Sequence, residues 1–230
     1  MNNLQPDTVA DASVERPKQI LLIDDHPVTR QGLALQIRFE PNLEVCGEAA
    51  DADAAMELVS ELLPDLAVVD VSLSAGNGIE LVKRMKIEHP QIRCLVYSMY
   101  EESLYADRAL RAGAAGYVNK TTPPDEVIRA IHRVLSGHVY VSPQLSEVML
   151  TRMVRGQKAV SSNPAQLLSD RELESFQMMG RGMTTRQIAE ALQLSPKTIE
   201  TYRARIKVKL NVDSMAELTR LAAQWVLENG

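Results

Sequence analysis

The chain has 230 residues, of which 45% are hydrophobic and 24% charged, a composition typical of globular proteins with room for two domains. The net charge of −5 argues against nonspecific nucleic-acid binding by the whole surface. Only two cysteines occur, which excludes a disulfide framework and a Cys/His zinc site. No apolar run approaches the roughly 18 residues of a membrane span, so we expect no membrane contact. Residues 1–17 are polar and acidic, unlike a signal peptide, and we expect a disordered leader on a cytoplasmic protein.

Residues 18–137 alternate short apolar segments with segments of helical periodicity. The predicted strands are 19–23, 43–47, 66–69, 92–97 and 116–118, each rich in Val, Ile or Leu. The first helix follows Pro27 and is expected to bury Val28, Leu35 and Phe39. Cys46 and Cys94 lie in these apolar segments and are expected to be buried, reduced thiols. Five strand–helix repeats predict an α/β domain with a doubly wound, five-stranded parallel sheet.

Residues 138–165 form the predicted connection, with a helical extension at about 144–155 and a flexible linker after it. From residue 166 to residue 230 strand signals vanish and four helix starts appear. Ser169, Thr184 and Ser214 each stand three residues before Glu or Gln, the spacing of a capping box. Ser195 is followed by Pro196, which gives an N-cap with Pro at the first helical position. This part is predicted to be an all-α domain of four short helices.

Three carboxylates follow predicted strands whose carboxyl ends share one edge of the sheet. Asp24 and Asp25 end the first strand and Asp70 ends the third. A pair of Asp residues alone is more often a solvated loop or a helix cap. Three together would repel one another and raise each other's pKa unless a cation held them ionised. Mg²⁺ suits this oxygen-rich set, and the backbone carbonyl of Ser72 could add a ligand.

Two more polar residues end neighbouring strands. Ser98 ends the fourth strand and Lys120 follows the fifth. Each alone would be read as an ordinary strand-end hydroxyl or surface ammonium. Together they supply a short donor and a compact positive charge, which a phosphorylated Asp70 requires. Asp70 would act as the nucleophile.

The spacing of these residues, with Tyr117, resembles the receiver domains of two-component signalling, and the segments LLIDDHP and GYVNK resemble the NarL/FixJ subfamily. The resemblance implies a flavodoxin-like fold in which Asp70 accepts phosphate from a sensor histidine kinase. It implies that Asp25 and Asp70 bind Mg²⁺ directly, that Asp24 does so through water, and that Ser98 and Tyr117 form the conformational switch.

The chain departs from the receiver pattern at two positions. Ser74 stands where receivers often have Pro, and Thr121 follows the lysine where Pro is frequent. Gly78 matches the glycine expected eight residues after the phosphoacceptor. These differences bear on loop geometry and on the lifetime of the phosphoryl group more than on phosphorylation itself.

Residues 185–192, a tight turn and residues 196–210 predict a helix-turn-helix whose second helix is rich in Lys and Arg. A cationic helix face is usually only solvated, but the caps and the turn favour DNA binding. The stretch from Leu168 to Ala223 resembles the LuxR-type helix-turn-helix. The resemblance implies that the helix from Pro196 enters the major groove of double-stranded DNA.

Individual DNA contacts follow from side-chain chemistry. Lys197, Thr198 and Arg203 are expected to contact phosphates, with Lys207 on the same cationic helix. Glu200 and Thr201 could face bases, by accepting from a cytosine amine and touching a thymine methyl.

The resulting hypothesis is a DNA-binding transcription regulator, not an enzyme, in which phosphorylation of Asp70 promotes homodimerisation and operator binding. A phosphorylation-independent regulator with a non-switching receiver is the alternative, and the complete set of pocket residues argues against it. A metal-dependent phosphatase on the same fold is a further alternative. It leaves the appended helical domain unexplained.

Overall fold

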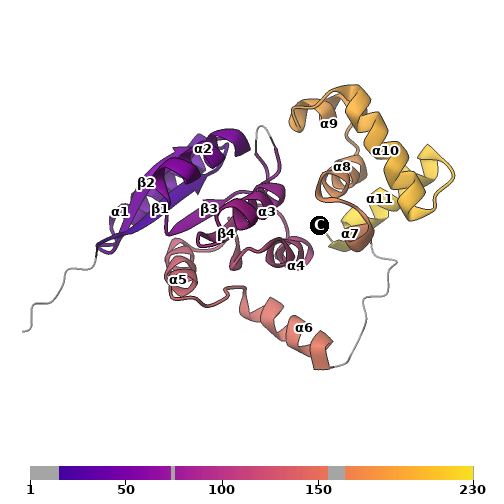
Figure 1. Ribbon diagram of the computed structural model, residues 1–230. Coiled ribbons are helices and arrows are strands. Elements are labelled where there is room, and N and C mark those ends of the chain that lie inside the picture. Colours follow the sequence, from indigo (N-terminus) through magenta and orange to yellow (C-terminus); the bar gives the residue numbers. More distant parts are fainter. Residues whose placement is uncertain (1–15, 74–75, 155–163, 230) are drawn as a thin grey trace, which may run out of the picture.

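The first half of the chain is a parallel α/β sheet in the computed structural model, which describes residues 16–73, 76–154 and 164–229 (Figure 1). Most of the predicted leader and most of the predicted linker lie outside these residues. The strands form the predicted five-stranded parallel sheet, and their order across it is β2-β1-β3-β4-β5. They are β1 (Lys18–Ile23), β2 (Leu43–Ala49), β3 (Leu66–Val69), β4 (Arg93–Ser98) and β5 (Gly116–Asn119).

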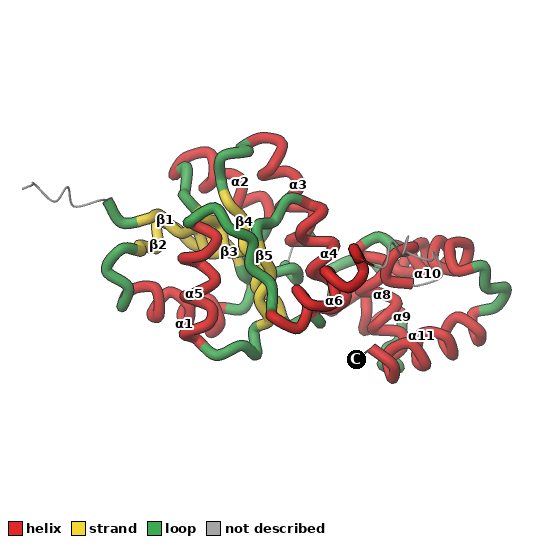
Figure 2. The backbone as a smooth tube through the Cα atoms, turned by 90° about the horizontal axis from the view of Figure 1, so that it is seen from below, coloured by secondary structure: helices red, strands yellow, loops and turns green. Residues whose placement is uncertain are grey.

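Helices cover both faces of this sheet (Figure 2). They are α1 (Pro27–Arg38), α2 (Ala52–Leu62), α3 (Gly78–Glu88), α4 (Glu102–Ala112) and α5 (Pro124–Leu135). One apolar cluster joins α1 and α5 to one face, and a second joins α2, α3 and α4 to the other. Because the strand order reverses direction between β1 and β3, the carboxyl ends of these two strands flank a crevice suited to a ligand.

The buried face of α1 differs from the prediction. Val28, Leu35 and Phe39 are exposed, and Leu33 and Ile37 pack against the sheet instead. At 100° per residue, the two sets lie on opposite sides of the helix. Both sides of the helix carry apolar residues, so the periodicity of the sequence alone predicted the wrong buried side. Cys94 is buried, but Cys46 on the edge strand is only partly so, and both are free thiols.

The second half is helical. Its helices are α6 (Pro143–Val154), α7 (Pro164–Leu167), α8 (Asp170–Gly180), α9 (Thr185–Ala191), α10 (Pro196–Leu210) and α11 (Met215–Asn229). Capping boxes start α8 at Ser169 and α9 at Thr184, and the Ser195 hydroxyl accepts from the Thr198 amide at α10. At Ser214 the box is incomplete, because Glu217 accepts from the Asp213 amide and not from that of Ser214.

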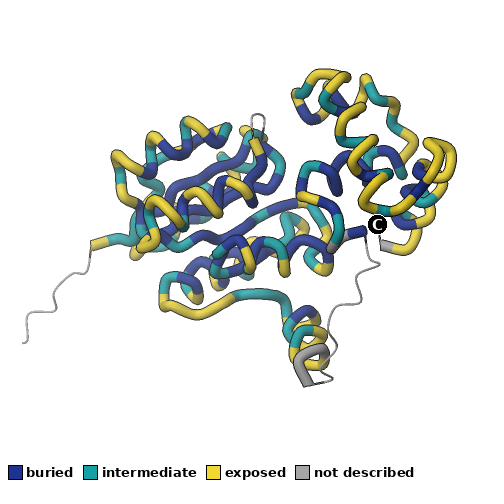
Figure 3. The backbone as a smooth tube through the Cα atoms, turned by 45° about the vertical axis from the view of Figure 1, so that its right-hand side comes forward, coloured by how far each residue is buried: buried dark blue, intermediate teal, exposed yellow. Residues whose placement is uncertain are grey.

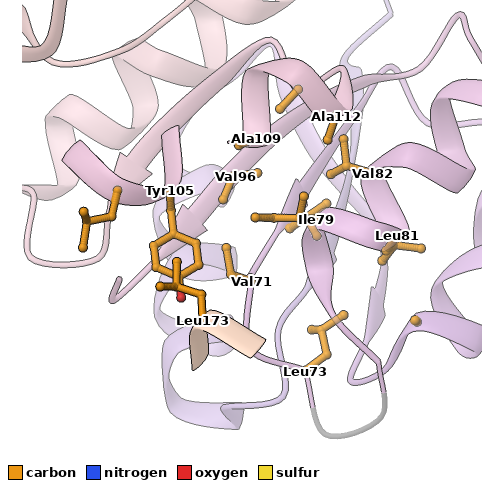
Figure 4. Packing of buried hydrophobic residues seen from close by; sticks show 14 of the residues in the cluster. Val71, Leu73, Ile79, Leu81, Val82, Val96, Tyr105, Ala109, Ala112 and Leu173 are labelled. Atoms are coloured by element: carbon orange, nitrogen blue, oxygen red, sulfur yellow. The ribbon is translucent and has the colours of Figure 1, made fainter. Parts of the chain in front are cut away.

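The two halves share a continuous apolar contact. Leu173 of α8 is fully buried and belongs to the same cluster as Tyr105 of α4 (Figure 4). Coloured by burial, α8 is largely buried while much of α10 is exposed (Figure 3). The helical half therefore contacts the sheet domain through α8. In the part of the chain that the structure describes, no helix has the length and apolarity to cross a bilayer.

Candidate functional site

The ends of β1, β3 and β5 bring three predicted residues into direct contact. The Lys120 ammonium lies 2.7 Å from Oδ2 of Asp24 and 2.7 Å from Oδ2 of Asp70. All three side chains are nearly buried, and that of Asp70 is only 3% exposed. The Asp70 amide donates to the Ile23 carbonyl at 2.8 Å, which joins the ends of β1 and β3. The strand ends thus bring Asp24, Asp70 and Lys120 together at the edge of the sheet where the sequence located them, and Lys120 pairs with both carboxylates.

Burial and charge oppose each other in this cluster. Burial raises the pKa of Asp70, and the Lys120 ammonium only partly offsets this. Burial alone would lower the pKa of Lys120, but Asp70 and Asp24 outweigh it and raise that pKa. Lys120 therefore stays protonated, and Asp70 carries its negative charge at a cost.

The pocket has oxygen atoms suited to a hard cation. The Oδ1 atom of Asp70 is buried and makes no hydrogen bond within the described part of the chain. Oxygens of Asp24, Asp25 and Asp70 lie within 4.8 Å of one another, together with a ring nitrogen of His26. A buried carboxylate oxygen without a donor fits a divalent metal, whose charge would keep Asp70 ionised.

His26 was not among the predicted site residues. Its Nδ1 lies 2.7 Å from Oδ1 of Asp25 and 3.4 Å from Oδ1 of Asp24, and its side chain is exposed at the mouth of the pocket. The position of His26 directly after Asp24 and Asp25 in the sequence could have identified it as a residue of the site.

Ser98 and Tyr117 lie next to each other behind the pocket. The Tyr117 ring is fully buried, and its hydroxyl donates to the Tyr100 carbonyl at 2.7 Å. The Tyr100 amide contacts Oγ of Ser98 at 3.4 Å. Burial raises the pKa of Tyr117, whereas a hydrogen bond with Ser98 lowers it. The two predicted switch residues thus share Tyr100 as a common neighbour.

Ser72 and Gly78 belong to the segment that follows β3. Ser72 pairs with Asn77 in an isolated antiparallel bridge, and the Gly78 amide donates to the Val71 carbonyl at 2.8 Å. A Cβ on Gly78 would lie 1.8 Å from the Asp70 carbonyl oxygen, so only glycine fits. The start of α3 is therefore pressed against the backbone of Asp70.

The cationic helix α10 exposes half of the predicted DNA contacts to solvent. Lys197, Glu200 and Thr201 are exposed, while Thr198, Arg203 and Lys207 are half-buried. Glu200, Arg203 and Lys207 line a groove between α10 and the start of α11. Buried Ile199 and Ile206 hold the opposite face of α10 in the helical core. Arg203 also binds the Thr185 hydroxyl at the start of α9, so it joins the two helices of the motif.

A seam of polar contacts between the halves was not predicted. Arg108 of α4 binds Asp170 and donates to the Leu168 carbonyl at 2.7 Å. The Tyr105 hydroxyl contacts Gln177 at 3.3 Å, and the Asn77 amide donates to Glu174 at 3.0 Å. No sequence pattern pairs residues this far apart in the chain.

Comparison with protein families gives two matches. Residues 20–132 match the response regulator receiver domain. Residues 166–222 match the bacterial regulatory proteins of the luxR family. The first match covers the sheet and its helices, and the second covers α8, α9 and α10.

Relatives match both halves together. The chain is 34% identical to the response regulator GacA of Pseudomonas syringae pv. syringae over 206 residues, 90% of this chain and 95% of that protein. It is 38% identical to the transcriptional activator protein ExaE of Pseudomonas putida over 205 residues, 89% and 95% of the two chains. Both relatives therefore share its two-part arrangement.

Two solved structures are also similar. A LuxR-family response regulator from Aurantimonas sp. SI85-9A1 is 36% identical, with a TM-score of 0.57 over 60% of this chain and 99% of that one. RcsB of Salmonella typhimurium has a TM-score of 0.64 over 91% of this chain and 98% of its own, at 22% identity. The second likeness supports the fold alone.

Proposed function

Because the chain belongs to the two-component response regulators that join a receiver domain to a LuxR-type DNA-binding domain, we propose that phosphorylation of Asp70 controls its binding to DNA. Residues 18–137 would be the receiver, 138–165 the connection and 166–230 the DNA-binding domain. The observation that supports this best is the buried Asp70, held 2.7 Å from Lys120 with its second oxygen unpartnered.

The proposed reaction is phosphoryl transfer from a histidine kinase. A carboxylate oxygen of Asp70 forms a bond to phosphorus while the P–N bond of the phosphohistidine breaks. The electron pair returns to the imidazole nitrogen, which then takes up a proton. Lys120, which lies 2.7 Å from Asp70, would neutralise a phosphoryl oxygen, and the Ser98 hydroxyl would donate to another.

The oxygens of Asp24, Asp25 and Asp70 and the Ser72 carbonyl would hold Mg²⁺. The ion, when bound, screens negative charge between the carboxylates and the incoming phosphoryl group. The Ser98 hydroxyl and the Tyr117 ring are placed to pass the change at Asp70 to Tyr100.

DNA would be bound by α10. Lys197, Thr198, Arg203 and Lys207 are the proposed phosphate contacts, and Glu200 and Thr201 the proposed base contacts. Dimerisation after phosphorylation would place two such helices on one operator. The exposed apolar side chains of Val28 and Leu35 on α1 and of Phe39 at its C-cap support an association surface on the receiver.

Labelling with a small phosphodonor tests the proposal. We expect radiolabelled acetyl phosphate and Mg²⁺ to label the wild-type chain, and Asp70→Asn to abolish that label. Asp107→Asn on α4 is the matched control and should label normally, because Asp107 is half-exposed and pairs with Arg111. A label that persists in Asp70→Asn would contradict the assignment of the phosphoacceptor.

A further inference from the structure

Helix α8 of the DNA-binding half contacts the segment that carries the proposed metal ligand Ser72. The Asn77 side-chain amide donates to Oε1 of Glu174 at 3.0 Å. Arg171, one turn earlier on α8, binds the Gly76 carbonyl and also pairs with Oε2 of Glu174 at 2.9 Å. Two neighbouring residues of this segment are thus held by two neighbouring side chains of α8.

Asn77 connects these contacts to the pocket. Its Oδ1 accepts from the amides of Ile79 and Glu80, which caps α3. The bridge between Asn77 and Ser72 joins the two sides of the segment, and Ser72 follows Asp70 by two residues. A shift of Asn77 therefore moves both the start of α3 and Ser72.

Burying the Glu174 carboxylate between the two halves of the chain costs free energy. Glu174 is 0% exposed, and burial raises its pKa to about 7, although Arg171 and Asn77 oppose the rise. Buried ion pairs contribute little net stability compared with apolar residues of similar size, and one use of them is to specify an arrangement. Apolar contact between the halves is already provided next to it by Leu173.

We propose that Glu174, supported by Arg171, is a positioning residue of the metal-binding pocket, acting from the DNA-binding domain through Asn77 on Ser72. This inference rests on the proposed function, since it assumes a divalent cation at Asp25, Asp70 and Ser72. By linkage, a cation bound in the pocket strengthens the contact between α8 and Asn77 to the same degree as that contact strengthens metal binding.

Metal affinity of the full chain, without phosphodonor, tests the inference. Mn²⁺ binding is measured by electron paramagnetic resonance, and Mg²⁺ binding by competition. We expect Glu174→Ala and Asn77→Ser each to weaken Mn²⁺ binding by about fivefold, at the low end of ordinary couplings between sites. Serine retains the N-cap of α3 but is too short to reach Glu174. This second variant leaves the charge unchanged, so its effect cannot come from lost electrostatic attraction.

Three further variants sharpen the test. Glu174→Gln keeps the acceptor for Asn77 and should stay within about twofold of the wild type. The double variant Glu174→Ala/Asn77→Ser should bind Mn²⁺ no more weakly than either single variant, since both remove one contact. Glu190→Ala removes an exposed carboxylate of α9 and should leave the affinity unchanged. Circular dichroism establishes that each variant is folded.

Unchanged affinity in folded Asn77→Ser, or additive losses in the double variant, would overturn the inference. So would a loss in Glu174→Gln equal to that in Glu174→Ala, because it would make charge the cause. A wild-type chain that binds no Mn²⁺ would also overturn it. Failure in the variants alone leaves the acetyl phosphate label on Asp70 intact, whereas failure of the proposed function removes that label from the wild type.

Discussion

The acidic pocket and helix α10 are both polar, yet they are built in opposite ways. In the pocket, Asp24, Asp70 and Lys120 are nearly buried and paired with one another. On α10, Lys197, Glu200 and Thr201 point to solvent from a helix held by its other face. The charged groups of the pocket are therefore neutralised by one another inside the folded chain, whereas these three polar side chains of α10 remain in solvent.

Substituting two glycines should give the largest difference in stability between the pocket and the helical half. Gly78→Ala should destabilise the receiver by about 3 kcal/mol, because a Cβ would overlap the Asp70 carbonyl oxygen. Gly182→Ala, between α8 and α9, should cost only about 1 kcal/mol, since its φ of +82° is left-handed but the space around it is open. Urea denaturation measures both, with Trp225, the only tryptophan, reporting on the helical half. Equal losses of unfolding free energy would mean that the pocket is no more closely packed around Gly78 than the loop between α8 and α9 is around Gly182.

Substitution of the phosphoacceptor should raise stability. Because burial raises the pKa of Asp70 above its unfolded value, the folded wild type loses stability as pH rises from about 4 through the folded pKa. At pH 7, without divalent cation, we expect the free energy of unfolding of Asp70→Asn to be higher than that of the wild type. This difference in unfolding free energy should become smaller at acidic pH. Mg²⁺ should also reduce it, because the ion should stabilise only the wild type. If Asp70→Asn is less stable than the wild type at pH 7, the ionised Asp70 carboxylate does not destabilise the folded chain.

On α10 the same kind of substitution should affect only DNA binding. Lys197→Ala removes an exposed charge, so folding stability should change by less than about 0.5 kcal/mol. DNA affinity should fall about fivefold, and the slope of log affinity against log salt should decrease in magnitude by about 1. Arg84→Ala, which removes an exposed positive charge from the solvent face of α3 in the receiver, is the matched control and should change neither. Equal effects of both variants would exclude α10 as the specific DNA contact.

The pocket could be predicted from the sequence because buried parallel strands leave a clear signal. The strands are short Val-, Ile- and Leu-rich runs, and their carboxyl ends must meet at one edge of the sheet. This was enough to bring Asp24, Asp70 and Lys120 together before their distances were known.

What could not be predicted depends on packing between distant parts. The face of α1 was wrong because apolar residues occupy both of its sides, and only contact with the sheet selects Leu33 and Ile37. The bond between Asn77 and Glu174 joins residues 97 positions apart, and no periodicity encodes it. In the sequence, Glu174 looks like a solvated helix residue, whereas docking of α8 buries it completely.

Control of DNA binding by Asp70 is tested most directly by the affinity of the full chain for DNA, measured with and without acetyl phosphate and Mg²⁺. The probe is a duplex selected from random DNA by the phosphorylated protein, titrated by fluorescence anisotropy. We expect phosphodonor to tighten binding by the wild type about tenfold, within the usual range of couplings between sites, and to leave Asp70→Asn unchanged. Equal affinity with and without phosphodonor, or the same gain in Asp70→Asn, would contradict the account.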